Sequence, residues 1–326
     1  MLVALCIWAA NATAEIKLTN ALTKDIGRAY GFYLGQNYSL NEISKKYPFL
    51  SGLALIAEKE FSANFQSSIE SMDTLMTKDA KDEWRKIKGT ISKQIAASIN
   101  IDQITETQAR QFVNLVRQRA KGNIESPVIE TLLLFKSGYE KSPEREFLDG
   151  YKYKYTNDGT GKAKSVAFSI EVPKTWAAKE GNRPNIVQKF VNENGRGLGL
   201  LFILIKEMPL LPGKKVTEKD VAEMLNLRDI KDFLPDGSTY IKSGKLTLEN
   251  LPGLWVHFRM ELSRVKNVVS METIMYTIFY KNKMIQIQGQ VVTSVNGKPM
   301  DRGSLEKYER LFDLMANSFV IANIYQ

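Results

Sequence analysis

Cysteine and histidine are almost missing from this sequence of 326 residues, which contains one of each. Zinc fingers, histidine-rich metal sites and Cys–His nucleophile pairs need several such residues, so none of these sites is expected. The sequence also has no Gly-Lys-Ser/Thr phosphate loop, no Gly-x-Ser-x-Gly turn and no two-histidine zinc motif. We therefore expect no metal and no cofactor.

Long apolar runs are lacking as well. The longest run, residues 198–205, has the length of a strand, whereas a helix that crosses a bilayer needs about 20 apolar residues. The composition, with 44% hydrophobic and 25% charged residues, is typical of a soluble protein with a core. Because domains average roughly 150 residues, the length suggests two of them. The net charge is +9.

The first residues have the pattern of a secretory signal peptide. An uncharged apolar run ends in Ala12-Thr-Ala14, a small-x-small cleavage pattern, although no Lys or Arg precedes the run. We expect residues 1–14 to be removed; the alternative is a buried N-terminal strand. Removal takes Cys6 away, keeps the charge at +9 and leaves an exported chain, periplasmic or secreted, without cysteine.

Residues 15–150 are predicted to form a helical domain. Ser39-Leu-Asn-Glu42 has the pattern of a capping box that opens a short helix ending before Pro48. Apolar residues three and four apart then predict two long antiparallel helices, and further helices begin near Thr105 and Pro127. The buried positions expected in the two long helices are Phe61, Phe65, Ile69, Met72 and Met76, and Trp84, Ile87, Ile91 and Ile95.

The pattern changes near Gly150. Residues 151–155 and 166–172 alternate between apolar and polar side chains across a glycine-rich turn, which predicts a hairpin. Two later helices are expected to begin at Thr217 and Ser304. Short connections between the other strands predict a mainly antiparallel sheet. These strands are expected at residues 187–191, 198–205, 240–248, 254–262, 268–280 and 284–292.

The second half resembles the Mog/PsbP-like family over about residues 160–323. Phe168-Ser-Ile-Glu-Val-Pro173-Lys-Thr-Trp176 is similar to the opening strand of that fold, and a closing helix that ends in Asn317-Ser-Phe319 also fits. The resemblance implies a three-layer α/β/α sandwich. Known relatives include an extrinsic photosystem subunit and a nuclear-import factor that binds the GTPase Ran, so the resemblance implies binding and no catalytic site.

The predicted fold class is therefore α+β. An N-terminal all-helical domain (residues 15–150) precedes an α/β/α sandwich with a mainly antiparallel sheet (residues 151–326).

Three motifs suggest chemistry, and each has a simpler interpretation that we favour. Gly195-Arg-Gly-Leu-Gly-Leu200 resembles a dinucleotide loop, but a strand follows it where such a loop requires a helix. Asp158 could begin a calcium loop, but no acidic residue follows until Glu171, which favours a plain turn. His257 could act as a general base, but a position on one face of a strand explains it.

Basic residues are the remaining signal. Arg117, Arg119 and Lys121 cluster at the end of a helix, where cations also suit the helix dipole. Residues 151–155 interleave tyrosine with lysine, as in surfaces that stack bases, but a two-faced strand explains the alternation and nucleic acid is not an expected partner of an exported protein. A second cluster lies around Trp176, where the alternatives are a binding surface for an anionic partner and a solvated face. This candidate interaction surface comprises Trp176, Lys179, Arg183, Lys189 and Arg196.

The sequence thus predicts an exported, non-catalytic binding protein. Its partner would be a protein or an anionic envelope or extracellular component, such as a glycan or a lipid headgroup. The alternative is a secreted enzyme, such as a hydrolase, with a site assembled from distant Asp, Glu, Ser and Tyr residues. A cleft with two carboxylates, or a serine beside His257, would favour the enzyme, and a flat apolar or basic patch would favour binding.

Overall fold

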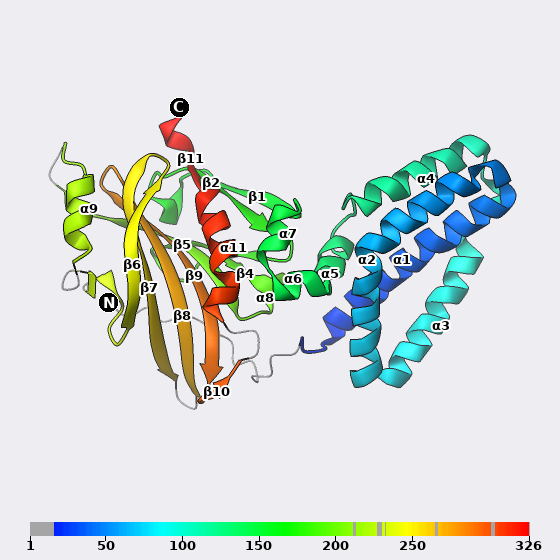
Figure 1. Cartoon of the computed structure of the whole chain (residues 1–326), viewed down its shortest axis with the longest axis horizontal. Coiled ribbons are helices and arrows are strands. Elements are labelled where there is room, and N and C mark those ends of the chain that lie inside the picture. Colours follow the sequence, from blue (N-terminus) through cyan, green and yellow to red (C-terminus); the bar gives the residue numbers. More distant parts are fainter. Residues whose placement is uncertain are drawn as a thin grey trace. The chain divides into compact units, whose positions relative to one another are not determined.

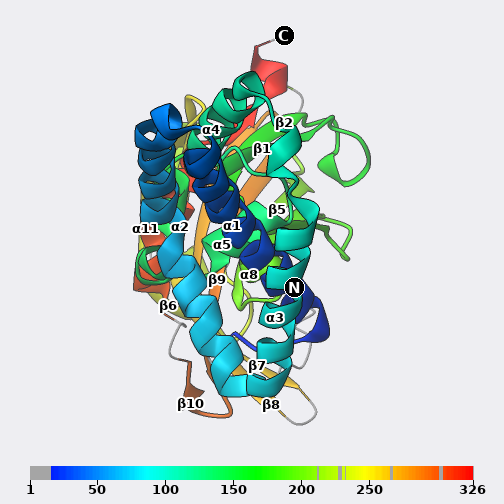
Figure 2. The ribbon, with the colours of Figure 1, turned by 90° about the vertical axis from the view of Figure 1, so that its right-hand side faces the viewer.

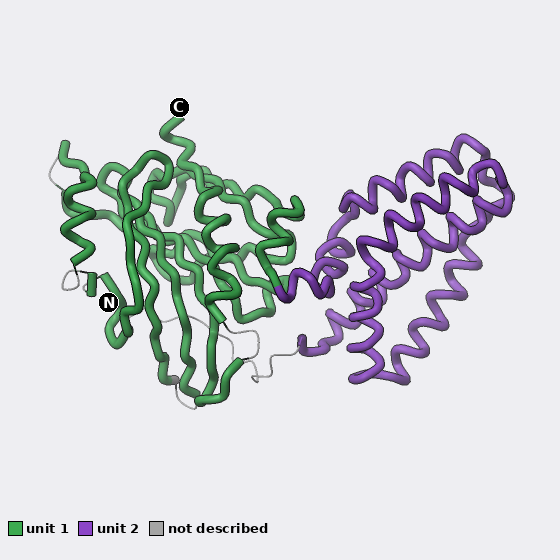
Figure 3. The backbone as a smooth tube through the Cα atoms, in the orientation of Figure 1, with its two compact units in different colours: residues 1–15, 142–326 green, residues 16–141 purple. Residues whose placement is uncertain are grey.

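The structure, a computed structural model, describes residues 16–210, 213–226, 230–231, 233–264, 267–300 and 304–325. The predicted signal peptide, with Cys6, lies outside these residues. The described chain divides into two compact units, a helical unit of residues 16–141 and a sheet unit of residues 142–326 (Figure 3).

Four helices of three or more turns build the helical unit (Figure 1). The first, α1, is a single helix whose buried side chains recur every three or four residues from Leu22 to Ile43. Its cap is Thr19, whose Oγ1 accepts a hydrogen bond from the amide of Leu22. The predicted helix start at Ser39 is therefore wrong, because the apolar stripe continues through that motif. The four helices are α1 (Asn20–Lys46), α2 (Ser51–Asp79), α3 (Lys81–Ser98) and α4 (Glu106–Ala120).

The two predicted apolar stripes differ in how deeply they are buried. All five expected positions of α2 are buried. In α3, which lies on the other side of α1 from α2 (Figure 2), only Trp84 is buried, and Ile87, Ile91 and Ile95 remain half-buried. The prediction of a fully buried α3 stripe is thus wrong. The shorter helices of this unit are η1 (Pro48–Leu50), η2 (Ile101–Gln103), α5 (Val128–Leu134) and α6 (Ser137–Lys141).

All strand pairs that the structure describes in the sheet unit are antiparallel, and a mainly antiparallel sheet was predicted. A small sheet has the order β1-β2-β11. The large sheet has the order β3-β4-β5-β9-β8-β7-β6, and β10 pairs with β9. The eight predicted strands are present, whereas the short strands β3, β10 and β11 were not predicted. The strands are β1 (Lys152–Asn157), β2 (Phe168–Pro173), β3 (Ala177–Glu180), β4 (Ile186–Val191), β5 (Gly199–Glu207), β6 (Thr239–Leu248), β7 (Leu251–Arg264), β8 (Asn267–Tyr280), β9 (Lys283–Val295), β10 (Lys298–Pro299) and β11 (Val320–Ile321).

Helices cover both faces of the large sheet. Helix α11 (Leu305–Asn317) packs with the small sheet in one apolar core, and α9 (Glu218–Met224) packs in a second core on the other face. Gly289 of β9 lets α11 approach, since a Cβ atom there would overlap the ring of Phe312. The chain is therefore an α+β protein with a helix–sheet–helix sandwich in its second half. The remaining short helices here are α7 (Glu144–Leu148), α8 (Asn192–Gly195), η3 (Gly161–Ala163) and η4 (Ala322–Ile324).

Helix α7 belongs to the sheet unit, although the sequence placed residues 144–148 in the helical half. Phe147 is buried in the core beneath α11. The buried carboxylate of Glu146 accepts hydrogen bonds from the amide of Thr175 at 2.9 Å and from its hydroxyl at 2.6 Å. These contacts place the division between the units at residues 141 and 142 rather than at Gly150.

Candidate functional site

Trp176 is a core residue, so its assignment to the interaction surface is wrong. Its side chain is 3% exposed, and its ring packs edge-on against Tyr308 and Phe312, with centroids 6.4 and 5.9 Å away. The reason is the tight turn after β2, in which the amide of Trp176 donates to the carbonyl of Pro173 and the indole turns inward.

Three of the predicted cations do gather at one edge of the large sheet. The β3–β4 register places Lys179 directly opposite Lys189. The Lys179 ammonium donates a hydrogen bond to the carbonyl of Gly195 at 2.6 Å, and the next residue, Arg196, is exposed. We call Lys179, Lys189 and Arg196 the basic edge. Arg183 lies apart from it, in the turn at the other end of the β3–β4 hairpin.

Two of the three predicted cations at the end of α4, Arg117 and Arg119, serve the fold. Arg117 binds the carboxylate of Glu60 through two hydrogen bonds of 2.8 and 3.0 Å, and this ion pair lowers the pKa of Glu60. Arg119 donates to the buried side chain of Gln36 and lies over the ring of Phe32.

The tyrosines of β1 pack against the core of the sheet unit and are not free to stack on bases. The hydroxyl of Tyr153 donates to the carbonyl of Trp176, and that of Tyr155 donates to the side chain of Gln188. Burial raises the pKa of Tyr153 to about 12. The alternation therefore reflects a two-faced strand.

The two loop motifs have structural roles. Asp158 accepts hydrogen bonds from the amide and hydroxyl of Thr160, which lower its pKa. In the glycine run after α8, a Cβ atom on Gly197 would overlap the buried side chain of Asn192, which also accepts from the amide of Gly199. Among the residues that the structure describes, no group of three or more His, Cys, Asp or Glu side chains could hold a metal ion.

His257 lies beside a carboxylate that is already engaged. Its Nε2 atom is 3.8 Å from Glu272, which also binds Arg259. Burial lowers the pKa of His257, and the charge of Glu272 opposes this effect. Neither ring nitrogen has a hydrogen-bond partner within the described parts of the chain. These observations favour a neutral imidazole that packs within the sheet. A general base would need a hydrogen-bonding partner with which to exchange its proton.

A polar stripe runs across the α9-side face of the large sheet. Thr273 of β8 is opposite Gln290 of β9, and Thr277 is opposite Gln286, with Gln288 between the two glutamines. All five side chains are buried. Both amide atoms of Gln290 and the hydroxyl of Thr273 have no hydrogen-bond partner in the described structure, although such groups are normally paired.

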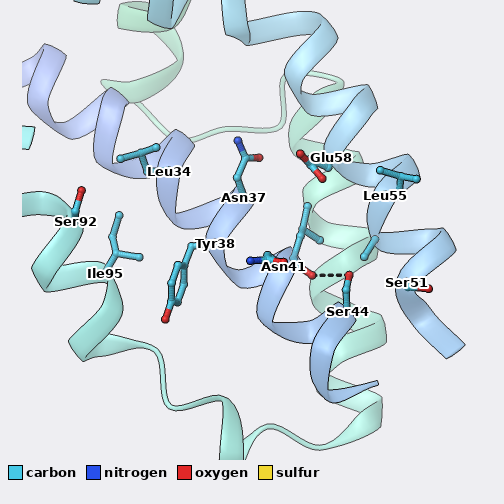
Figure 4. A pocket seen from close by; sticks show the side chains of 12 residues that line it. Leu34, Asn37, Tyr38, Asn41, Ser44, Ser51, Leu55, Glu58, Ser92 and Ile95 are labelled. Carbon is cyan, nitrogen blue, oxygen red and sulfur yellow. Dashed lines mark hydrogen bonds between the residues drawn. The ribbon is translucent and has the colours of Figure 1, made fainter. Parts of the chain in front are cut away.

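The helical unit contains a groove of about 760 Å³ between α1, α2 and α3 (Figure 4). Its volume falls within the roughly 300–1,000 Å³ of ligand clefts. The groove is lined by Leu34, Asn37, Tyr38, Leu40, Asn41 and Ser44 of α1, by Ser51, Ala54, Leu55 and Glu58 of α2, and by Ser92 and Ile95 of α3.

A change in helix spacing opens this groove. A Cβ atom on Gly27 or Gly31 of α1 would lie 3.7 or 3.4 Å from Ile87 or Ile91 of α3, so the two helices are in contact there. One turn further along α1, a Cβ atom on Gly35 would meet nothing within 4 Å. The helices have separated at this point, and the groove begins.

The far end of the groove is fixed by a lysine. The ammonium of Lys46 donates to three backbone carbonyls of the segment after α3, those of Ile101, Asp102 and Ile104, at 2.8–3.0 Å. The hydroxyl of Tyr47 also donates to the carbonyl of Ile104 at 2.6 Å. These bonds hold the end of α1 against the α3–α4 connection, so the groove has a defined shape.

Hydrogen-bond acceptors and apolar walls meet in the groove. The buried Oδ1 atom of Asn37 has no hydrogen-bond partner, and the half-buried Glu58 makes no ion pair, as far as the described residues go. Leu55 is 53% exposed, and Leu34 and Ile95 are half-buried. In Figure 4, Asn37 and Glu58 extend into the space between α1 and α2.

No protein-family model matches the chain, and no curated protein matches it. Solved structures are similar to about half of it. The PsbP protein of the cyanobacterium Synechocystis sp. PCC 6803 is 16% identical, with 52% of this chain and 92% of that chain covered and a TM-score of 0.33. A PsbP protein is thus among the similar structures, as the sequence resemblance predicted.

Two further structures show a likeness of the same extent. LpqN of Mycobacterium tuberculosis, described as involved in cell envelope biogenesis, is 11% identical, with 55% of this chain and 96% of that chain covered and a TM-score of 0.31. A protein of Bacteroides thetaiotaomicron is 13% identical, with 52% and 48% covered and a TM-score of 0.30. Because these scores are low, we transfer no ligand or partner from them.

The groove residues were not predicted from the sequence. A signal was present in the spacing of Gly27, Gly31 and Gly35 along one face of α1, which allows a close helix contact at that face. The orphan acceptor of Asn37 depends on the packing of three helices and has no counterpart in a local pattern.

Proposed function

We propose that this chain is an exported, non-catalytic binding protein whose sheet unit recognises an anionic partner, either an acidic protein or a component of the envelope or extracellular space. The observation that supports the proposal is the basic edge. Lys179 and Lys189 lie opposite each other across β3 and β4, and Arg196 follows the carbonyl that Lys179 binds.

Two lysines directly opposite each other repel, and such like-charge pairs destabilise a sheet. An anion bound between them would relieve the repulsion. Lys179 is on the edge strand β3, where a partner can approach. Lys189 is on the neighbouring strand β4, and Arg196 follows α8. Because the net charge of the chain is +9, attraction acts over about a Debye length, ~8 Å at physiological ionic strength. An anionic surface is therefore the partner that this edge fits.

Retention on immobilised heparin, a generic polyanion, tests this proposal. We expect the double variant Lys189→Gln with Arg196→Gln to elute at lower salt than the unmodified chain. The matched control is Lys86→Gln with Lys93→Gln, which removes the same charge from exposed positions of α3. Equal elution of the two double variants would refute a role of the basic edge.

Export is supported by the signal-peptide pattern of residues 1–14. The expected product begins at Glu15. The intact mass of the protein recovered from the envelope or culture fluid checks this, and an exported protein that retains residues 1–14 would contradict it. In the part of the chain that the structure describes, no helix is both long and apolar enough to cross a bilayer.

A further inference from the structure

The groove of the helical unit holds one unpaired charge. Glu58 lines the groove, is half-buried and makes no ion pair among the described residues. An occupant that covers Glu58 removes water from its carboxylate, and this costs free energy unless the occupant brings donors. A neutral donor would leave the charge of Glu58 covered and uncompensated. The chemistry therefore selects an ammonium or a guanidinium group.

The walls of the groove select an occupant with apolar side chains on either side of that cation. Leu34, Leu55 and Ile95 come from three different helices and are all incompletely buried. The α3 stripe of Ile87 and Ile91 continues the apolar surface beyond the groove and is also half-buried. Burying such surface stabilises a complex by about 25 cal/mol per Å² of apolar area.

The backbone of the occupant must satisfy its own polar groups. The walls are helices, whose backbone hydrogen bonds are internal, so an extended peptide would find no strand edge with which to pair. A helical segment has no such requirement, and it can pack against three helices as a fourth.

We propose that the groove between α1, α2 and α3 binds a helical segment of a partner protein, which directs a lysine or arginine side chain toward Glu58. The site is separate from the basic edge in residues, in structural unit and in the charge that it recognises. It makes the protein a two-site binder, with a cation-accepting groove in one unit and an anion-attracting edge in the other.

Selection from a displayed library of helical 18-residue peptides on the full chain tests the proposal. Peptides are counter-selected on Ser92→Trp, which fills the groove from an exposed position of α3. We expect the enriched peptides to carry a lysine or arginine flanked at three or four residues by Leu, Ile or Met. The absence of peptides that distinguish the two proteins, or enrichment without a preferred cation, would overturn the proposal.

Point variants separate the role of Glu58 from misfolding. The affinity of a selected peptide, measured by fluorescence anisotropy, should fall about tenfold or more in Glu58→Gln, because hydrogen bonds to charged groups are strong. Glu83→Gln, which removes the same charge from an exposed position of α3, should change it less than twofold. An equal effect of the two substitutions would exclude Glu58 as the partner of the cation.

Spermidine provides the last arm, since it carries the same cation without a peptide. The peptide proposal would be overturned by two results together: spermidine binds the full chain but not Ser92→Trp, and the library yields no groove-dependent peptide. The groove would then bind a small amine. The heparin experiment reports on the basic edge alone, so failure of one proposal is distinguishable from failure of the other.

Discussion

Replacing Gln290 with methionine should stabilise the protein. Gln290 is 2% exposed, and neither atom of its amide has a hydrogen-bond partner among the described residues. The hydroxyl of its cross-strand neighbour Thr273 is also unpaired, so Thr273 makes no hydrogen bond to the amide. Methionine has a similar length and no strong polar group, so it keeps the packing and removes the unpaired atoms.

The expected gain follows from the cost of an unsatisfied buried group, about 1–3 kcal/mol. Gln290→Met should therefore raise the free energy of unfolding of the sheet unit by about 1–3 kcal/mol. For a unit of this size, each kcal/mol corresponds to a shift of about 2–4 °C in Tm.

Urea unfolding, followed by tryptophan fluorescence and fitted with one transition for each unit, measures this change. Gln288→Met is the matched control, because the Gln288 amide donates to Gln286 Oε1 at 3.0 Å. Its loss leaves that acceptor unpaired and should lower the free energy of unfolding by about 1 kcal/mol. A Gln290→Met protein that is no more stable than the unmodified chain would refute the reasoning, since the amide would then have a partner, such as a bound water or ligand.

Three further outcomes are expected. Gly289→Ala should destabilise the sheet unit by about 1–3 kcal/mol, because its Cβ atom would overlap Phe312, and Phe312→Leu in the same chain should restore part of the loss in a thermal melt. Burial raises the pKa of Asp313, so its favourable contribution is present below the unfolded pKa of about 3.9 and is lost as pH rises through the folded pKa. The free energy of unfolding of Asp313→Asn, relative to that of the unmodified chain, should therefore be higher at about pH 7 than at about pH 4. Urea unfolding that gives the same difference between the two proteins at both pH values would contradict this. A fragment of residues 142–326 should fold alone. A fragment of residues 160–326 lacks α7 and β1, so it should expose apolar surface that binds a hydrophobic dye. Equal circular dichroism melts of the two fragments would show that α7 and β1 do not contribute to stability.

Periodicity in the sequence predicts most of the elements because their buried faces are regular. The eight longer strands and the α2 stripe from Phe61 to Met76 follow directly from period 2 and from spacings of three and four. The same rule fails for α3, since Ile87, Ile91 and Ile95 have helical spacing but no complete partner. A periodic stripe shows which face is apolar and does not show whether that face is covered.

The site residues were harder to predict because their roles depend on contacts between distant segments. The sequence places cations around Trp176, but a turn of four residues directs the indole into the core. The pairing of Lys179 with Lys189 depends on the register of β3, a strand too short to be recognised. Asn37 and Glu58 lie on different helices, and both line a groove that opens where α3 separates from α1 after Gly31.

The strand order of the large sheet has a consequence for folding during synthesis. Strand β9 (Lys283–Val295) lies in the middle, between β5 and β8, yet it is the last of the long strands to leave the ribosome. Before it arrives, β3–β5 and β6–β8 are two separate ribbons with unpaired inner edges, and contacts between residues distant in sequence form slowly. The sheet unit therefore closes only when nearly the whole chain has been delivered.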